Sequence, residues 1–177
     1  MKIVIVGAGA VGDDLARRVS LRESNVVVIE LDHDRAVKAQ EHLDCRVVEG
    51  NGVNPGFLED VGMDNTDLFA AVTDSDETNI ISSLTAHRLG ARVKVARVRS
   101  PEYYRGDQLV FDGIDLAINP DIEAVRAMRK ILWESAATDV HDFAGGRVRV
   151  VGAKVDDSAF VVGKTLQQVE KALGSRW

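Results

Sequence analysis

Short apolar runs recur along the chain and alternate with longer stretches of mixed polarity. The first run, residues 3–6, is long enough for one buried strand, and similar runs occur at residues 25–30, 46–49, 68–72, 93–98 and 116–118. The stretches between them place apolar residues at helical spacing, which predicts helices over residues 13–19, 35–42, 55–61, 77–89 and 120–133. Strands that alternate with helices indicate a parallel sheet covered on both faces, and therefore an α/β, Rossmann-like, doubly wound fold.

Polar residues and glycines at the ends of these segments define the expected helix boundaries. Asp34 is expected to cap the second helix, and Asn119 to cap the fifth directly before Pro120. Gly90 is expected to close the fourth helix, because glycine readily adopts the left-handed conformation that ends many helices. Residues 100–113 predict one further short helix and a loop.

The pattern changes near residue 138. Residues 140–143 and 147–151, separated by the Gly145–Gly146 turn, predict an antiparallel hairpin, and residues 166–173 predict a short helix. Residues 1–137 hold 16 basic and 23 acidic side chains, whereas residues 138–177 hold 6 and 5. We therefore expect a Rossmann-like domain over residues 1–137, including its C-terminal helix. Residues 138–177 are expected to form a partial α+β segment that is truncated or completed by a partner.

The first apolar run leads directly into a glycine motif. Residues 7–12, Gly-Ala-Gly-Ala-Val-Gly, match G-x-G-x-x-G and lie between a predicted strand and a predicted helix, which is the context of a dinucleotide-binding fold. In such folds Gly7 permits a tight turn, Gly9 lets a pyrophosphate approach the backbone, and Gly12 lets the helix pack closely on the strand. The N-terminus of the helix then presents free N–H groups to the phosphates.

An acidic residue closes the second predicted strand. Glu30 lies 18 positions after Gly12, about where a dinucleotide fold places the carboxylate that binds a ribose 2′-hydroxyl. A solvated acid after a strand is the alternative, and the glycine motif favours the ligand role. Because an acid repels a 2′-phosphate, NAD(H) or a plain adenine nucleotide is favoured over NADP(H). Asp32 is a second candidate, which could instead lie in the turn before the next helix.

More polar groups follow the third, fourth and fifth predicted strands. Residues 50–52 (Gly-Asn-Gly), the pair Thr73 and Asp74, and Arg97 occupy these positions. Ligands of open α/β sheets bind beyond the carboxyl ends of the strands, so we expect these groups to converge there. Arg97 would offer a fork of donors to a phosphate. The alternatives are that Asp74 and Asp76 cap the following helix, and that Arg97 pairs with a structural acid.

Composition narrows the classes of partner and compartment. The net charge of −6 argues against nucleic acid as the main partner, because nucleic-acid phosphates demand a basic surface. The single cysteine, Cys45, excludes an internal disulfide and fits a reducing cytosol. No apolar run approaches the roughly 20 residues that cross a bilayer, and the chain enters a strand at once, so neither a span nor a leader is expected.

Four blocks together resemble the TrkA family of regulators of bacterial Trk potassium-uptake systems, which are built from RCK (also called KTN) domains. They are residues 7–12, 71–79, 96–103 and 118–120, and the resemblance covers almost the whole chain at matching intervals. The second and third blocks are far more specific than the glycine motif, which many dehydrogenases share. The segment from residue 140 resembles the opening of the C-terminal RCK subdomain of the family.

This resemblance implies a cytoplasmic regulatory subunit and not an enzyme. Members of the family bind NAD(H), ATP or ADP in the Rossmann site and pair through the helix after the sixth strand. They assemble into rings beneath a membrane potassium-transporter subunit, at the inner face of the membrane. Carried onto this sequence, the resemblance and the residue patterns predict one binding site, formed by Gly7, Ala8, Gly9, Ala10, Val11, Gly12, Glu30, Leu31, Asp32, Gly50, Asn51, Gly52, Thr73, Asp74, Asn79 and Arg97.

The helix expected over residues 120–133 carries an apolar stripe at helical spacing, composed of Ile122, Val125, Met128, Ile131 and Leu132. Such a stripe usually belongs to a core. At the end of a complete six-strand unit it could equally pack against a second subunit, and the sequence leaves both alternatives open.

An NAD-dependent oxidoreductase is the alternative function. It would need a substrate domain and a general acid or base near the nicotinamide. The four histidines, His33, His42, His87 and His141, lie on predicted helix surfaces or in the appended hairpin, away from the expected ligand edge. One cysteine and scattered histidines give no zinc pattern, and the acids near residue 74 lack EF-hand spacing. We therefore assign no catalytic and no metal-ligating residue.

Overall fold

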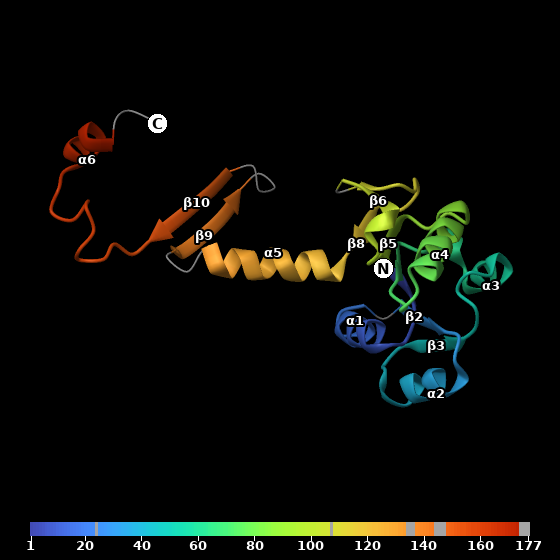
Figure 1. Cartoon of the computed structure of the whole chain (residues 1–177). Coiled ribbons are helices and arrows are strands. Elements are labelled where there is room, and N and C mark those ends of the chain that lie inside the picture. Colours follow the sequence, from blue (N-terminus) through green and yellow to red (C-terminus); the bar gives the residue numbers. More distant parts are fainter. Residues whose placement is uncertain (24, 107, 134–136, 144–147, 174–177) are drawn as a thin grey trace. The chain divides into compact units, whose positions relative to one another are not determined.

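The structure, a computed structural model, describes residues 1–23, 25–106, 108–133, 137–143 and 148–173 (Figure 1). Its contacts divide the chain into two units, Met1–Glu123 and Ala124–Trp177. That division falls inside a helix, so the domain boundary expected at residue 137 stays a prediction. No helix in these ranges is both long and apolar enough to cross a membrane.

The first unit is built on a six-stranded parallel sheet. In spatial order its strands are β3 (Arg46–Glu49), β2 (Asn25–Glu30), β1 (Lys2–Val6), β4 (Leu68–Ala71), β5 (Val93–Arg97) and β8 (Leu116–Ile118). The chain moves outward in one direction from β1 to β3 and in the other from β4 to β8. The strand order therefore reverses between β1 and β4, which is where doubly wound sheets bind ligands. The predicted α/β, Rossmann-like architecture is confirmed.

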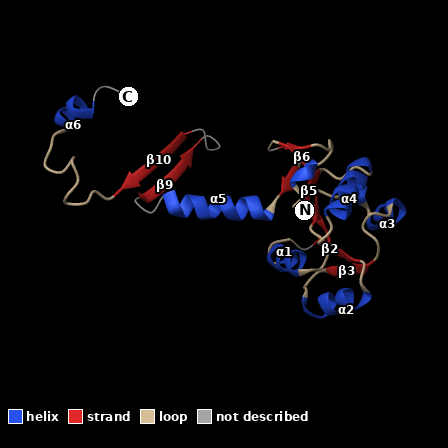
Figure 2. Ribbon diagram, viewed as in Figure 1, coloured by secondary structure: helices blue, strands red, loops and turns tan. Residues whose placement is uncertain are grey.

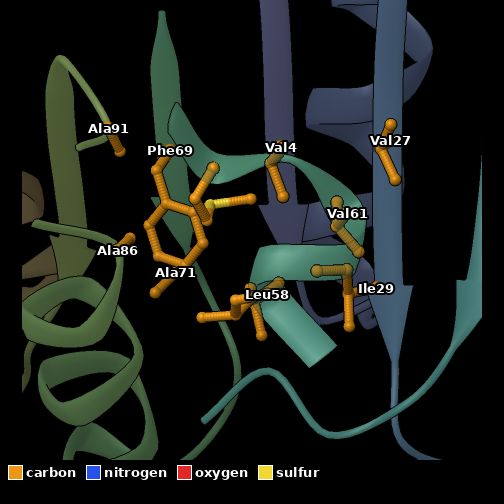
Figure 3. Close-up of a cluster of buried hydrophobic side chains, with 11 residues drawn as sticks. Val4, Val27, Ile29, Leu58, Val61, Phe69, Ala71, Ala86 and Ala91 are labelled. Carbon is orange, nitrogen blue, oxygen red and sulfur yellow. The ribbon is translucent and has the colours of Figure 1, made fainter. Parts of the chain in front are cut away.

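Alternating side chains of the central strands form two separate cores, one on each face of the sheet. On one face Ile3 and Ile5 pack with Ala16 of α1 (Ala10–Ser20) and Ala39 of α2 (His33–His42). On the other face, Val4 and Phe69 pack with residues of α3 (Pro55–Val61) and α4 (Asp76–Arg88), as Figure 3 shows. Helices on both faces explain why these strands read as continuous apolar runs (Figure 2).

Three of the expected helix starts are wrong: α1 begins at Ala10 and not at residue 13, and α2 and α4 begin two residues and one residue before their expected starts. The cap of α2 is Asp32 and not Asp34, because the Asp32 carboxylate accepts a hydrogen bond from the Arg35 amide at 2.9 Å. The cap of α4 is Ser75, whose hydroxyl accepts from the Thr78 amide at 3.1 Å. In both places several cap-forming residues are adjacent, and only the backbone path selects among them.

The segment between β5 and β8 differs from the expected helix and loop. It contains a 3₁₀ turn, η2 (Pro101–Tyr103), and a small antiparallel hairpin of β6 (Tyr104–Arg105) and β7 (Gln108–Leu109). A second 3₁₀ turn, η1 (Met63–Asn65), follows α3. Tyr103, Tyr104 and Leu109 cover a third small core around Ile80 and Val98. Elements this short bury too few residues for a pattern to identify them.

The helix α5 (Pro120–Trp133) begins at the expected cap and leads into the second unit. That unit contains an antiparallel hairpin of β9 (Ala137–Phe143) and β10 (Val148–Ala153), followed by α6 (Leu166–Leu173). The hairpin and the short helix were both expected. The predicted Gly145–Gly146 turn lies outside the described residues.

Candidate functional site

A cavity of about 830 Å³ lies beyond the carboxyl ends of β1, β2 and β4, at the reversal of strand order. Its volume is in the range of sites for small molecules and cofactors. All of the predicted site residues except Ala8, Gly12 and Asn79 line it. The remaining lining residues, which the sequence did not single out, are Val6, Arg35, Val53, Val72, Ser75 and Thr78.

The three motif glycines meet different physical demands. Gly7 has φ +100°, and its N–H donates to the Ile29 carbonyl at 2.8 Å, so the turn after β1 requires glycine. A Cβ on Gly12 would lie 1.8 Å from the Gly7 carbonyl oxygen. A Cβ on Gly9 would meet nothing within 4 Å. Gly7 and Gly12 are therefore needed for the fold, whereas Gly9 keeps space free in the cavity.

The first turn of α1 provides donors beside that space. The helix begins at Ala10 with Gly9 as its cap residue, and Gly9 has no side chain to bond the amides of the first turn. Ala10 and Val11 line the cavity together with Gly9. Free N–H groups at a helix N-terminus favour an anion such as a pyrophosphate. This end of the cavity therefore has both the donors and the space that an anion would need.

Glu30 is buried, with 7% of its surface exposed, and its carboxylate joins two loops. One oxygen accepts from the Ala8 amide at 2.6 Å and the other from the Asp32 amide at 3.0 Å. Ala8 therefore holds Glu30 in place and does not form a wall of the cavity. A carboxylate offers about four acceptor positions, so both oxygens can still accept a ribose hydroxyl.

The start of α2 forms the rim next to Glu30. Leu31 is exposed there, and Asp32 both caps the helix and lines the cavity. Arg35, one turn further on, also lines the cavity and is exposed. Sequence reasoning missed Arg35, because it placed the cap of this helix at Asp34 and not at Asp32.

A buried amide fixes the opposite wall. Asn79 is fully buried, and its oxygen accepts from the Thr73 amide at 2.8 Å and the Thr73 hydroxyl at 2.7 Å. Its Nδ2 donates to the carbonyls of Thr73 and Arg97, at 3.1 and 2.8 Å. Asn79 lies behind the wall and positions Thr73 and Arg97, which line the cavity.

Arg97 projects from the end of β5 into this wall. Its guanidinium donates to the Thr73 carbonyl at 3.0 Å, and its Nε is buried without a hydrogen-bond partner among the described residues. The recorded partner is a carbonyl, and not the structural acid considered as an alternative. An orphaned guanidinium donor at a cavity wall fits an anionic ligand. Asp74 lines the same wall, and its carbonyl accepts from Arg99.

Residues 50–52, which follow β3, line a further side of the cavity, and their backbone path depends on close packing. A Cβ on Gly50 would lie 2.2 Å from the Phe57 ring, and one on Gly52 would lie 2.4 Å from Val6. Asn51 lines the cavity while its side-chain oxygen accepts from the Val53 amide at 3.1 Å. Gly50 therefore lets the chain pass close to α3 and Gly52 lets it pass close to β1, while Asn51 between them lines the cavity.

The described histidine side chains lie elsewhere. His33 bonds Glu49 at 2.7 Å, and this hydrogen bond raises the pKa of His33. His42 bonds Asp13, which raises the pKa of His42. His87 packs against Gly113. None of the three lines the cavity, and no group of three potential metal ligands occurs in the part of the chain that the structure describes.

Comparison with known proteins places this geometry in a family. Residues 3–120 match the family model of the TrkA-N domain. The Trk system potassium uptake protein TrkA of Halomonas elongata is 35% identical over 170 residues, which are 94% of this chain and 37% of that protein. A TrkA homologue from Archaeoglobus fulgidus is 34% identical, over 94% of this chain and 38% of its own length. The chain thus spans under two fifths of these two relatives.

Solved structures share the fold. The TrkA-N domain of the inner membrane protein ybaL from Escherichia coli superposes with a TM-score of 0.64 at 19% identity, covering 74% of this chain and 96% of that one. The GsuK channel bound to NAD superposes with a TM-score of 0.62 at 23% identity, covering 80% of this chain and 25% of that one. At these identities the likeness shows the fold alone.

Proposed function

We propose that the chain, which belongs to the TrkA-N domain family, is a regulatory module that binds NAD(H) or an adenine nucleotide and controls a membrane potassium transporter. One observation carries the binding function. A single cavity combines a helix N-terminus kept open by Gly9, the carboxylate of Glu30 and the orphaned guanidinium donor of Arg97. These groups match a pyrophosphate, a ribose and a further anionic group in turn.

The acid selects among nucleotides. Glu30 would accept the 2′-hydroxyl of an adenosine ribose, and its negative charge would repel a 2′-phosphate. NAD(H), ATP and ADP all satisfy this condition, whereas NADP(H) does not. Thr73, Asp74 and Arg97 would contact the part of the ligand beyond the first phosphates.

Binding without turnover is the second part of the proposal. Within the described residues, the walls contain no histidine, cysteine, lysine or tyrosine that would act as acid, base or nucleophile beside a nicotinamide. An oxidoreductase would also need a substrate domain. A steady oxidation of NADH with small carbonyl compounds would contradict this part of the proposal.

A regulator also needs a way to reach its partners. Val125 and Met128 of α5 are each 62% exposed, and Ile122 is 42% exposed, on one stripe of the helix. We infer that this stripe pairs with a second copy, and that dimers build a ring at the cytoplasmic face of a Trk-type transporter. The names of the relatives, potassium uptake proteins, support the choice of partner. A nucleotide would act by favouring one arrangement of the dimer over another.

The test is thermal and chemical stabilisation of the purified chain by NADH, NAD, NADPH, ATP and ADP in parallel. A ligand at 100 times its dissociation constant should add about 2.7 kcal/mol to the free energy of unfolding. We expect stabilisation by NADH, NAD, ATP or ADP and weaker stabilisation by NADPH. If none of the five stabilises the chain, the proposed binding function is wrong.

The regulatory part has its own test in a potassium-flux assay with the transporter. Gly9→Asp would place a carboxylate in the space left for phosphate and should abolish nucleotide binding. Flux should then lose its dependence on nucleotide. Flux that keeps this dependence after binding is lost would contradict the regulatory role.

A further inference from the structure

Three buried polar side chains connect the cavity wall to the start of α5. They are Asn79, Asp76 and Asn119, with 0%, 8% and 7% of their surfaces exposed. Polar groups are costly to bury and remain buried only when hydrogen bonds compensate them. Each of the three side chains bonds to the segment of residues 97–100, which begins at the last residue of β5.

The cavity side of this connection consists of α4. Asn79 joins Thr73 to the Arg97 carbonyl, as described above. Asp76, in the first turn of α4, accepts from the amides of Arg99 and Ser100 at 3.0 and 2.7 Å. The segment after β5 is therefore hydrogen-bonded to α4, the helix that follows the cavity-lining residues Thr73 and Asp74.

The far side of the connection is the cap of α5. Asn119 donates from Nδ2 to the Arg99 carbonyl at 2.6 Å. Its side-chain oxygen accepts from the amides of Asp121 and Ile122, at 3.0 and 3.2 Å. One amide group thus holds both Arg99 and the first turn of the helix that carries the exposed apolar stripe.

Arg99 is the junction between the two sides. Its main-chain carbonyl bonds Asn119, whereas its guanidinium donates to the carbonyl of Asp74, which lines the cavity. The guanidinium Nε lies 3.8 Å from the Asp76 Oδ1, an atom that is buried without a hydrogen-bond partner among the described residues. A displacement of Asp74 by a ligand therefore acts on a residue whose backbone also holds α5.

We propose that Arg99 and Asn119 are positioning residues that couple occupancy of the nucleotide cavity to self-association through α5. This inference rests on the proposed function, because it presumes that the cavity binds a nucleotide and that α5 pairs with a second copy. Neither residue lines the cavity. These two residues are expected to affect the linkage between nucleotide binding and dimer formation. Such linkage is reciprocal, because a nucleotide that tightens the dimer is itself bound more tightly by the dimer.

The experiment measures the dimer dissociation constant of the full 177-residue chain by sedimentation, with and without saturating NADH and, separately, ADP. Allosteric coupling typically amounts to about 5- to 150-fold, so we expect at least one of these nucleotides to change the constant of the wild type by about fivefold or more. Nucleotide affinity is measured in parallel, at protein concentrations below and above that constant.

Two variants each remove one hydrogen bond of Arg99, either to Asn119 or to Asp74. Asn119→Ser keeps a hydroxyl that caps α5 and removes the donor to the Arg99 carbonyl. Arg99→Gln shortens the partly exposed side chain that reaches Asp74 and keeps the backbone. The matched control is Asn54→Ser, the same substitution at the cap of α3, where Asn54 accepts from Phe57.

We expect both variants to bind nucleotide and to self-associate, with the coupling reduced to less than about twofold, while Asn54→Ser retains it. A merely structural role would change stability and leave the coupling unchanged. Wild-type coupling in both variants would overturn the inference. So would a wild type that dimerises and binds NADH or ADP without linkage to either, and that result would leave the binding function standing. A wild type that binds none of NADH, NAD, ATP and ADP overturns the proposed function itself.

Discussion

The two halves of the parallel sheet build the cavity by different means. On the side of β1 and β2, the cavity is formed by backbone amides, close-packed glycines and the acids Glu30 and Asp32, of which Glu30 bonds to adjacent loops. On the side of β4, β5 and β8, side chains form the walls, and the buried amides of Asn79 and Asn119 hold them from behind. Glu30 lines the cavity itself, whereas Asn79 and Asn119 lie behind its wall and bond to Arg97, Arg99 and the start of α5. We therefore expect the first half to define the ligand and the second to transmit its presence.

The largest effect should come from the close-packed glycine of the first half. Gly12→Ala would place a Cβ 1.8 Å from the Gly7 carbonyl oxygen, so the backbone itself would have to move. We expect a loss of about 3 kcal/mol or more in the free energy of unfolding, measured by urea denaturation. Gly56→Ala in α3 is the control, because its Cβ meets nothing nearer than 3.6 Å. Similar stabilities for the two variants would show that the turn after β1 adapts easily.

The second half should be nearly as sensitive at its central amide. Asn79→Ala removes the partners of the Thr73 amide and the Arg97 carbonyl, and we expect a loss of about 2–3 kcal/mol. Asn65→Ala changes an exposed asparagine and should stay within about 0.5 kcal/mol of the wild type. The measurement is again urea denaturation. A loss at position 79 no larger than at position 65 would show that water replaces these hydrogen bonds.

The same contrast explains what the sequence could predict. The glycine motif and Glu30 occupy fixed intervals after a buried strand, so their place at the carboxyl edge follows from sequence alone. The bonds of Asn79 to Arg97 and of Asn119 to Arg99 do not follow, because no motif of fixed spacing links these positions, which lie 18 and 20 residues apart. Asn119 was predicted only as a cap, which is the local half of its bonding.

The smaller errors in the predicted helix caps and strands also arise because the local sequence does not show the tertiary contacts that decide them. Asp32 and Ser75 cap their helices, whereas the sequence pointed to Asp34 and to Asp74 or Asp76. Neighbouring residues of equal capping ability are distinguished only by the direction of the incoming strand. The hairpin of β6 and β7 was missed because each strand is two residues long. The position of this hairpin depends on its packing over Ile80 and Val98, and the local sequence pattern does not show that packing.

A smaller change separates ligand binding from stability within the first half. Gly9 has φ −72°, a conformation open to any residue, and a Cβ there would point into open space. Gly9→Ala should leave the free energy of unfolding within about 0.5 kcal/mol of the wild type. Its methyl group would occupy the space left for phosphate, and we expect nucleotide affinity to fall about tenfold or more, equivalent to about 1.4 kcal/mol. Calorimetric titration with NADH and ADP measures the affinity; an unchanged affinity would place the phosphates away from this loop.

The smallest expected effect is a pH dependence confined to α2, the helix that forms the rim beside Glu30. The bond to Glu49 raises the pKa of His33, and the bond to Asp13 raises that of His42, above the ordinary value of 6.5. A raised pKa in the folded state stabilises the fold below about pH 6.5, and this contribution is lost as the pH rises through the raised values. Melting temperatures of the wild type should therefore fall slightly from pH 6 toward pH 9 relative to a His33→Gln, His42→Gln double variant. Both histidines are exposed, so salt should weaken the difference. The His87→Gln variant should keep the wild-type slope of melting temperature against pH. Equal slopes in the wild type, the double variant and His87→Gln would show that α2 does not respond to protons through the His33–Glu49 and His42–Asp13 pairs.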